Sequence, residues 1–348
     1  MTQVTQITLA TKKTAEVPVT GTIPSPGAAL GWWTGNNTAL FEDDPAIHDA
    51  IFNLNKHVYV LQGQNQEHVV TDQGIANIGG EPETDGLPLA GFSPANSPRQ
   101  LGDPDFCEDH NLRFPYMCGS MANGIASIEV VEAAANAGLL GSFGAAGLTL
   151  SEIENAAKHL TESLGSKPFC FNLIFSPNEK GHEEAVVSIY LKYGIRLIET
   201  SAYMKLTLPA VRYRVHGIHL NAAGEIEAPN RIIAKASRIE VATKWFSPPP
   251  EKMLAQLVAS GDITEEQATL ATQIPMAQDL TVEADSGGHT DNRPAITLIP
   301  TIIALRDRLQ SEFNYAMPLR VGAAGGIATP ASAAAAFSMG AAYVVTGT

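Results

Sequence analysis

The sequence predicts an α/β protein folded as a TIM (β/α)8 barrel over residues 111–348, preceded by an N-terminal extension over residues 1–110. From Arg113 onward, short apolar segments alternate with Ala-rich helical segments, a pattern typical of βα units repeated around a parallel sheet. The apolar segments supply the eight strands that a closed barrel requires. Glycines follow the last two of them, at strand ends where such barrels carry their functional loops.

The expected strands are short apolar runs. Eight of them lie at about 113–118, 140–145, 168–174, 195–200, 231–236, 279–284, 318–323 and 342–346. A further run at 216–220 or nearby is either a strand or a surface hairpin. Helices are expected between them at 127–138, 151–164, 182–193, 296–310 and 330–338. For the helix 151–164, either Thr149 or Ser151 could provide the N-cap.

The region before the barrel is rich in Gly, Pro, Asn and Asp and contains only short apolar runs. Within it, segments 57–63 and 68–73 flank a polar turn and predict a small β-hairpin. The first 25 residues are expected to form a loose tail.

An insertion is expected at about 245–276, because a Pro-rich run at 247–250 interrupts regular structure before two helical pieces that separate at Gly261. Thr264 and Gln267 have the spacing of a capping box for the second piece. The insertion is interpreted either as a helical cover over one barrel face or as a lid or docking surface. At the other end, the chain stops at Thr348 directly after the last strand, so we expect the final barrel helix to be missing from this sequence and to lie in further chain.

Composition excludes several classes of protein. The 22 Lys and Arg against 36 Asp and Glu give a formal net charge of −14, which would repel a nucleic-acid backbone. The three cysteines show no metal-binding spacing, and no secretory signal is recognised, so a reducing cytoplasmic location is expected. The uncharged stretch 321–348 is interrupted by glycines and Pro330, which argues against a membrane span.

The stretch 320–348 predicts a phosphate site. Gly325 and Gly326 follow one strand, and Gly347 and Thr348 follow the next. Glycine lets backbone N–H groups approach an anion closely, and the helix that starts near Pro330 adds favourable potential. The alternative is that these glycines serve only a tight turn.

The segment 282–294 supplies a candidate catalytic residue, His289, preceded by Gly287 and Gly288. Histidine suits proton transfer near neutral pH, and the C-terminal end of a barrel strand is the usual place for such a group. A loop histidine held by structural hydrogen bonds is the alternative.

Three further residues are candidates for contacts with a flat ring. Met121, in a glycine-containing loop, offers a soft apolar wall, although such a methionine often lies in the core. Asn172 lies in an apolar strand and needs a polar partner, for which the pyrimidine edge of a flavin is one candidate. Lys235 is a charge in a buried strand, and its partner is either the flavin N1/C2 region or a neighbouring acid, Glu199 or Glu283.

Taken together, GSMANG near the first strand, KPFCFN at the third, EADSGGH, and AAGGIA followed by GAAYVVTGT resemble the superfamily of nitronate monooxygenases and FMN-dependent enoyl reductases. The phrases IIAKASR, EADSGGHTDNRP and WWTG, with the Pro-rich insertion, are still more similar to the PfaD-type trans-acting enoyl reductases. The resemblance implies a non-covalent FMN and identifies His289 with the superfamily's catalytic histidine. The cofactor-binding positions that it suggests are Met121, Asn172, Lys235, Gly287, Gly288, Gly325, Gly326, Gly347 and Thr348.

The activity implied is reduction of α,β-unsaturated thioesters on an acyl carrier protein with NADPH as reductant, in polyunsaturated fatty acid or polyketide biosynthesis. A homodimer is one candidate assembly. Within the same fold the alternative is a nitronate monooxygenase that oxidises nitroalkanes or nitronates. Outside enzymes, the alternative is a barrel that binds a phosphorylated ligand or acts as a scaffold.

Overall fold

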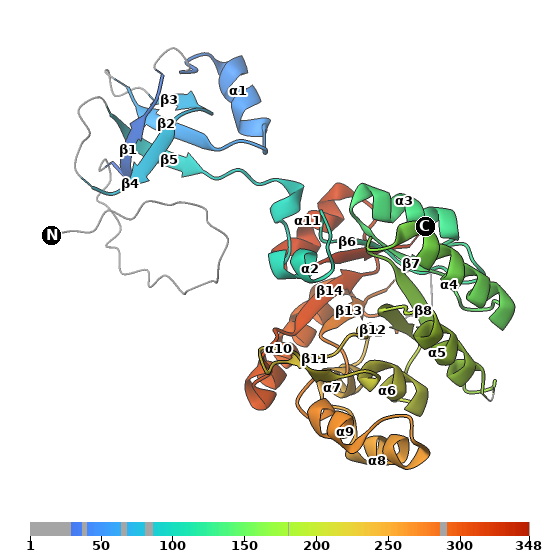
Figure 1. Ribbon diagram of the computed structural model, residues 1–348. Coiled ribbons are helices and arrows are strands. Elements are labelled where there is room, and N and C mark those ends of the chain that lie inside the picture. The colour runs from blue at the N-terminus through green and yellow to red at the C-terminus, as the bar shows by residue number, and fades with distance from the viewer. Residues whose placement is uncertain are drawn as a thin grey trace. The chain divides into compact units, whose positions relative to one another are not determined.

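The computed structural model describes residues 29–36, 40–63, 68–80, 86–179, 181–285 and 291–347. The chain divides into two compact units, Met1–Pro98 and Arg99–Thr348. The order of the elements within each unit can be followed by colour in Figure 1. The tail expected over the first 25 residues lies outside the described residues.

The first unit contains an antiparallel sheet with the strand order β3-β2-β5-β1-β4. Its elements are β1 (Gly31–Thr34), α1 (Asp44–Phe52), β2 (Val58–Gln62), β3 (His68–Thr71), β4 (Ile75–Ile78) and β5 (Leu87–Ser93). β2 pairs with β3 in antiparallel register, which confirms the predicted hairpin. Trp33 on β1 is fully buried and donates its indole N–H to the carbonyl of Gln73 at 2.8 Å.

In the second unit, eight parallel strands close into a barrel in the order β12-β13-β14-β15-β6-β7-β8-β9. This confirms the predicted fold class. The barrel strands are β6 (Tyr116–Cys118), β7 (Leu140–Phe143), β8 (Cys170–Ile174), β9 (Leu197–Ser201), β12 (Arg231–Ala236), β13 (Asp279–Glu283), β14 (Arg320–Ala324) and β15 (Val344–Thr346). The segment around 216–220 is a hairpin outside the barrel, formed by β10 (His219–Leu220) and β11 (Ile226–Glu227).

Helices surround the strands in Figure 1 and cover the outer face of the barrel. They are α3 (Ile128–Ala137), α4 (Leu150–Leu164), α5 (His182–Lys192), α6 (Leu208–Val215), α7 (Ile239–Phe246), α10 (Ala295–Phe313) and α11 (Pro330–Ser338). Of these, α6 and α7 are absent from the sequence-based assignment. α6 buries Arg214, whose guanidinium donates to the carbonyls of Pro275 and Asn230, so a charged residue stands where a helical pattern has an apolar one.

The insertion contains α8 (Glu251–Ser260) and α9 (Glu265–Ala271), which pack against α6. They separate at Gly261, whose φ of 78° is the left-handed conformation that favours glycine at a helix C-cap. Thr264 and Gln267 form the predicted capping box. Leu254 and Leu257 of α8 are buried, so α8 packs its apolar face on the helical layer to which α6 belongs. The interpretation of the insertion as a lid or docking surface stays a prediction.

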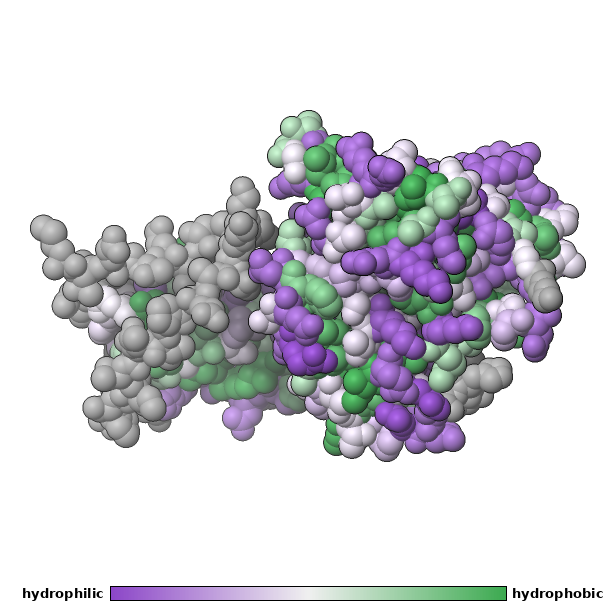
Figure 2. Space-filling model, turned by 90° about the horizontal axis from the view of Figure 1, so that it is seen from below, coloured by the Kyte–Doolittle hydropathy of each residue, from purple (hydrophilic) through white to green (hydrophobic). Residues whose placement is uncertain are grey.

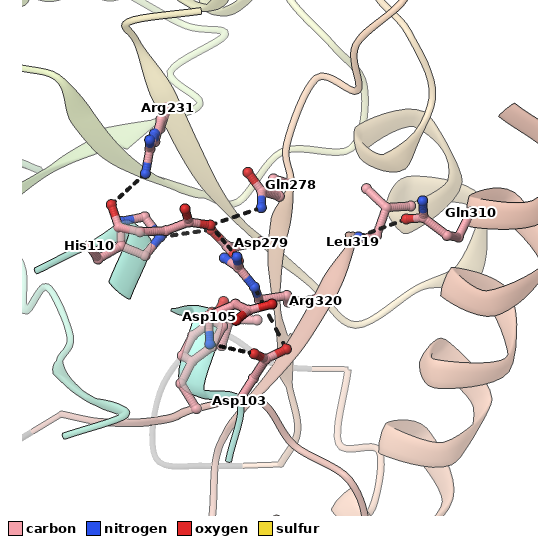
Figure 3. Close-up of polar contacts among 12 residues, drawn as sticks. Asp103, Asp105, His110, Arg231, Gln278, Asp279, Gln310, Leu319 and Arg320 are labelled. Carbon is pink, nitrogen blue, oxygen red and sulfur yellow. Dashed lines mark hydrogen bonds and ion pairs between the residues drawn. The ribbon is translucent and has the colours of Figure 1, made fainter. Parts of the chain in front are cut away.

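The N-terminal end of the barrel is closed by the short helix α2 (Pro104–Asp109), which lies in the stretch assigned by sequence to the N-terminal extension. Phe106 is fully buried and stacks on the ring of Tyr343, with centroids 4.0 Å apart and planes 6° apart. After α2, His110 contacts Asp279 at 2.8 Å, and Asp279 also pairs with Arg320 at 3.1 Å (Figure 3). Because Asp279 and Arg320 begin their strands, this network seals the N-terminal end and leaves the other end for ligands.

The surface of the barrel unit in Figure 2 is mixed, with hydrophobic residues in small groups among hydrophilic ones. None of the helices in the described part of the chain combines the length and apolar character needed to cross a bilayer. After β15, the described chain continues only to Gly347.

Candidate functional site

The candidate site lies at the C-terminal ends of the barrel strands, opposite α2. A pocket opens there beside β9, β12 and β13. The residues that line it include Tyr203, Met204, Lys235, Arg238, Glu283 and Asp291. The pocket therefore combines apolar walls with several ionisable groups, as binding sites in such barrels do.

Lys235 is a buried cation of this pocket, with a side chain only 11% exposed, and it pairs with the fully buried carboxylate of Glu199. The distance between Nζ and Oε1 is 2.9 Å. Burial alone would lower the pKa of Lys235, but the carboxylates of Glu199 and Glu283 outweigh it and hold that pKa above its ordinary value. For Glu199, burial alone would raise the pKa, whereas Lys235 and a hydrogen bond from Ser120 lower it below its ordinary value.

Both members of the pair are therefore charged at neutral pH. Of the two kinds of partner considered for Lys235, the neighbouring acid is thus present, and the flavin contact stays a prediction.

Asn172 is buried on β8, and its side-chain amide donates to the carbonyl oxygen of Glu199 at 3.2 Å and to Oγ of Ser201 at 2.8 Å. Its polar partners here are therefore protein groups. These two bonds use the donor capacity of the amide nitrogen, so the side-chain oxygen is the atom suited to accept an N–H from a ligand. The contact of Asn172 with a flavin edge stays a prediction.

Met121 lies half-buried in the loop after β6. A Cβ atom at Gly144 would lie 1.7 Å from the carbonyl oxygen of Met121, so only glycine permits this approach. A Cβ atom at Gly347 would lie 3.8 Å from Cγ of Met121. The structure thus brings Met121 and Gly347, two of the predicted cofactor residues, together.

The turn after β14 is a tight turn built on two glycines. Gly325 and Gly326 adopt φ angles of 91° and 70°, which favour glycine. Within the described residues, the backbone N–H groups of Gly325, Gly326 and Ile327 donate to no protein acceptor. A Cβ atom at Gly325 would lie 2.4 Å from the carbonyl oxygen of Ala284, so packing against the end of β13 also requires glycine there.

Gly287, Gly288, His289 and Thr348 lie outside the described residues, and their predicted roles stay predictions.

The chain on either side of 286–290 is described. Asp285 donates its backbone N–H to the carbonyl of Arg293 at 2.9 Å. Asp291 accepts hydrogen bonds from Arg238 and from Oγ of Ser237, the latter at 2.6 Å. The hydrogen bond from Arg238 has the largest effect on the pKa of Asp291, followed by that from Ser237, and together they hold this pKa well below its usual range. The two ends of this segment are therefore anchored to the barrel.

Sequence reasoning did not identify Arg238 and Ser201 as site residues, and it considered Glu199 only as a partner for Lys235. A signal for Glu199 was present, since an acid within the apolar strand segment LIETS is costly to bury without a partner. Arg238 gives no such signal, because it lies two residues beyond the end of its strand, where an exposed charge is ordinary. In the described part of the chain, no group of three or more His, Cys, Asp or Glu side chains could hold a metal ion.

This closed barrel with its polar pocket belongs to the nitronate monooxygenase family, whose model matches residues 107–348. The family was expected from the sequence resemblance, and the match confirms it.

Among its relatives are proteins of two biosynthetic systems. The chain is 48% identical over 250 residues to one component of the polyunsaturated fatty acid synthase of Thraustochytrium sp., a match that covers 71% of this chain and 17% of that protein. It is 42% identical over 248 residues to the polyketide biosynthesis protein PksE of Bacillus subtilis, a match that covers 71% of this chain and 32% of that protein. The chain therefore spans less than a third of each of these relatives.

Among solved structures, the barrel is similar to the enoyl reductase domain of MlnA, from the macrolactin biosynthesis cluster of Bacillus amyloliquefaciens. The TM-score is 0.69 and the sequence identity is 39%, over 72% of this chain and 56% of that one.

Proposed function

We propose that the chain is an FMN-dependent enoyl reductase that reduces α,β-unsaturated thioesters carried on an acyl carrier protein. The observation that carries the proposal is the similarity to the enoyl reductase domain of MlnA in both sequence and fold. The relatives in polyunsaturated fatty acid and polyketide synthesis support a carrier-bound substrate. NADPH is the proposed reductant.

The residues present fit FMN, which proteins of this family generally use. Gly325 and Gly326 suit the phosphate, because their backbone N–H groups and that of Ile327 have no acceptor among the described residues. Gly347 adds to them in the family pattern. The side-chain oxygen of Asn172 suits a ring N–H, and Met121 suits the face of the ring. When bound, FMN supplies hydride transfer. The barrel residues bind the cofactor, orient it toward the substrate and exclude water.

The catalytic proton is assigned to His289, which would polarise the thioester carbonyl or deliver the proton to the α-carbon. Lys235 is a weaker proton donor than an ordinary lysine, because Glu199 and Glu283 raise its pKa. Lys235 instead contributes a permanent positive charge to the pocket. Arg238 and Asp291 fix the end of the segment that carries the histidine.

The name of the matching family, nitronate monooxygenase, supports a second candidate function, the oxidation of nitroalkanes or nitronates. In that reaction His289 would remove a proton from a neutral nitroalkane, so His289→Ala should slow nitroalkane turnover but spare the ionised nitronate. In enoyl reduction the same variant should lose about 10²- to 10⁴-fold of thioester reduction and keep NADPH-driven flavin reduction.

The experiment follows flavin absorbance anaerobically by stopped flow. NADPH should bleach the bound flavin, and a crotonyl thioester on a carrier protein should restore the oxidised spectrum. The enoyl reductase would be rejected in favour of the monooxygenase by two results together. The reduced flavin would be reoxidised in the nitroalkane assay, and it would not be reoxidised by the thioester, whether carried on a carrier protein or on a small thiol.

A further inference from the structure

One buried residue, Glu199 on β9, contacts three segments of the candidate site. Its Oε1 pairs with Nζ of Lys235 on β12 at 2.9 Å. Its Oε2 accepts the backbone N–H of Ser120, in the loop that leads to Met121, at 3.1 Å. Its main-chain carbonyl accepts the amide of Asn172 on β8 at 3.2 Å. A single strand position thus joins three elements that the sequence assigns to cofactor binding.

A charge at this position is expected to add little to the stability of the fold. A fully buried ion pair gives little net stability, because desolvation of both ions offsets their attraction, and apolar residues of similar volume often replace such pairs without loss. A carboxylate does what an apolar side chain cannot, since it accepts a hydrogen bond from Ser120 through one oxygen and forms an ion pair with Lys235 through the other. Lys235 reaches the pocket, so the orientation of its ammonium group matters to a ligand there.

The other titratable groups around Lys235 do not replace Glu199. Glu283 also faces Lys235 and raises its pKa, but the close ion pair, at 2.9 Å, is with Glu199. Cys170 is fully buried beside the pair, and burial raises the pKa of its thiol well above the ordinary value. Cys170 is therefore neutral at neutral pH and does not compete for the ammonium group.

We propose that Glu199 is a positioning residue of the candidate site, whose carboxylate holds Lys235 and the Ser120 loop in the arrangement that receives the cofactor. Lys235 then serves as a fixed cation in the pocket. The inference rests on the proposed function, because it takes FMN as the ligand that these groups receive.

The test uses Glu199→Gln, Lys235→Met and the double variant in the full chain. Glutamine keeps the volume and can still accept from Ser120, but it removes the charge that faces Lys235. In Glu199→Gln, the apparent pKa of Lys235 should fall, as measured by brief acetic anhydride labelling across a pH series with mass spectrometry. The affinity of the apo-protein for FMN, measured by quenching of flavin fluorescence, should fall about 10- to 100-fold, as for other residues that orient a binding group.

The double variant separates positioning from simple structural support. It leaves neither member of the pair charged, so its melting temperature should return close to that of the wild type. If Glu199 acts on FMN through Lys235, FMN affinity in the double variant is as low as in Lys235→Met and no lower, despite restored stability. If FMN affinity recovers together with stability, the pair is only structural and the proposal is overturned. The double variant also decides the matter if either single variant does not fold.

Asp279→Asn is the matched control, since Asp279 is another buried carboxylate of the barrel interior that pairs with an arginine, at the opposite end of the strands. This variant should lose stability while FMN affinity and the labelling curve of Lys235 stay unchanged. An unchanged labelling curve in Glu199→Gln would overturn the proposal. Failure of the wild type to bind FMN would instead reject the proposed function, and the labelling of Lys235 would still report whether Glu199 orients it.

Discussion

Arg238 and Asp291 form a bidentate ion pair at the pocket, in which Nε and Nη2 of the guanidinium each lie 2.8 Å from a different carboxylate oxygen. Arg238 follows the end of β12, and Asp291 belongs to the chain after β13. The planar guanidinium matches the carboxylate in both distance and direction, so the pair holds one geometry. This contact ties the chain after 286–290 to the neighbouring strand.

The first prediction concerns the pH dependence of this pair. The pKa of Asp291 is lowered in the folded protein, chiefly by hydrogen bonds from Arg238, so its stabilising contribution is complete above the unfolded-state pKa of about 4 and is lost as pH falls toward the folded value. Asp291→Asn should therefore reduce the free energy of unfolding at pH 7, and the difference from wild type should shrink below about pH 4. Urea denaturation at several pH values measures it. A difference that stays constant with pH would contradict the assignment.

The second prediction concerns the start of α4, for which the sequence left two N-caps possible. Thr149 is the cap, since its Oγ1 accepts from the N–H of Glu152 while the Glu152 side chain accepts from the N–H of Thr149 at 2.8 Å. Thr149→Ala should cost about 1 kcal/mol of stability. Ser151→Ala, at an exposed position inside the helix, is the control and should change stability by less than about 0.5 kcal/mol. Denaturant titration distinguishes them.

The barrel strands were predictable because each is a short apolar run bounded by turn residues, which is a local signal. α6 gave no such signal, since its buried face includes Arg214 and the hydrogen-bond partners of that residue lie on distant segments. The closure of the barrel end by α2 also could not be predicted from the sequence. Phe106 packs on Tyr343 and His110 contacts Asp279, and both contacts join residues separated by more than half of the barrel sequence.

The glycine turn after β14 was predictable because positive φ angles select glycine locally. For Lys235 the sequence showed that a partner was required but left the flavin, Glu199 and Glu283 as alternatives. The parallel pairing of β12 with β9 sets Glu199 opposite Ile233, two residues before Lys235, and from these positions the two charged side chains meet at 2.9 Å. Glu199 itself could be noticed as a buried charge, but its three simultaneous contacts depend on closure of the barrel.

The third prediction concerns the closed end of the barrel. Phe106 is fully buried and stacked on Tyr343, so Phe106→Ala should destabilise the barrel unit by about 3–5 kcal/mol. Phe313→Ala is the control, because Phe313 is 36% exposed on α10 and its loss should be much smaller. Thermal and urea unfolding measure both. Equal losses for the two variants would show that α2 does not pack in the barrel as described.

The last prediction tests the phosphate site at the end of β15. Gly325 is unsuitable for this test, since any side chain there would collide with the carbonyl of Ala284 whether or not a phosphate binds. Gly347 is suitable, because its φ lies outside the left-handed region and a Cβ atom would meet Met121 only at 3.8 Å. Gly347→Asp places a carboxylate beside the proposed phosphate and should weaken FMN binding about tenfold or more, whereas Gly347→Ala adds bulk without charge and should bind nearly as wild type. Flavin fluorescence titration at low and high salt provides the measurement, since repulsion between charges weakens with screening. Equal FMN affinity in the Asp and Ala variants would place the phosphate elsewhere.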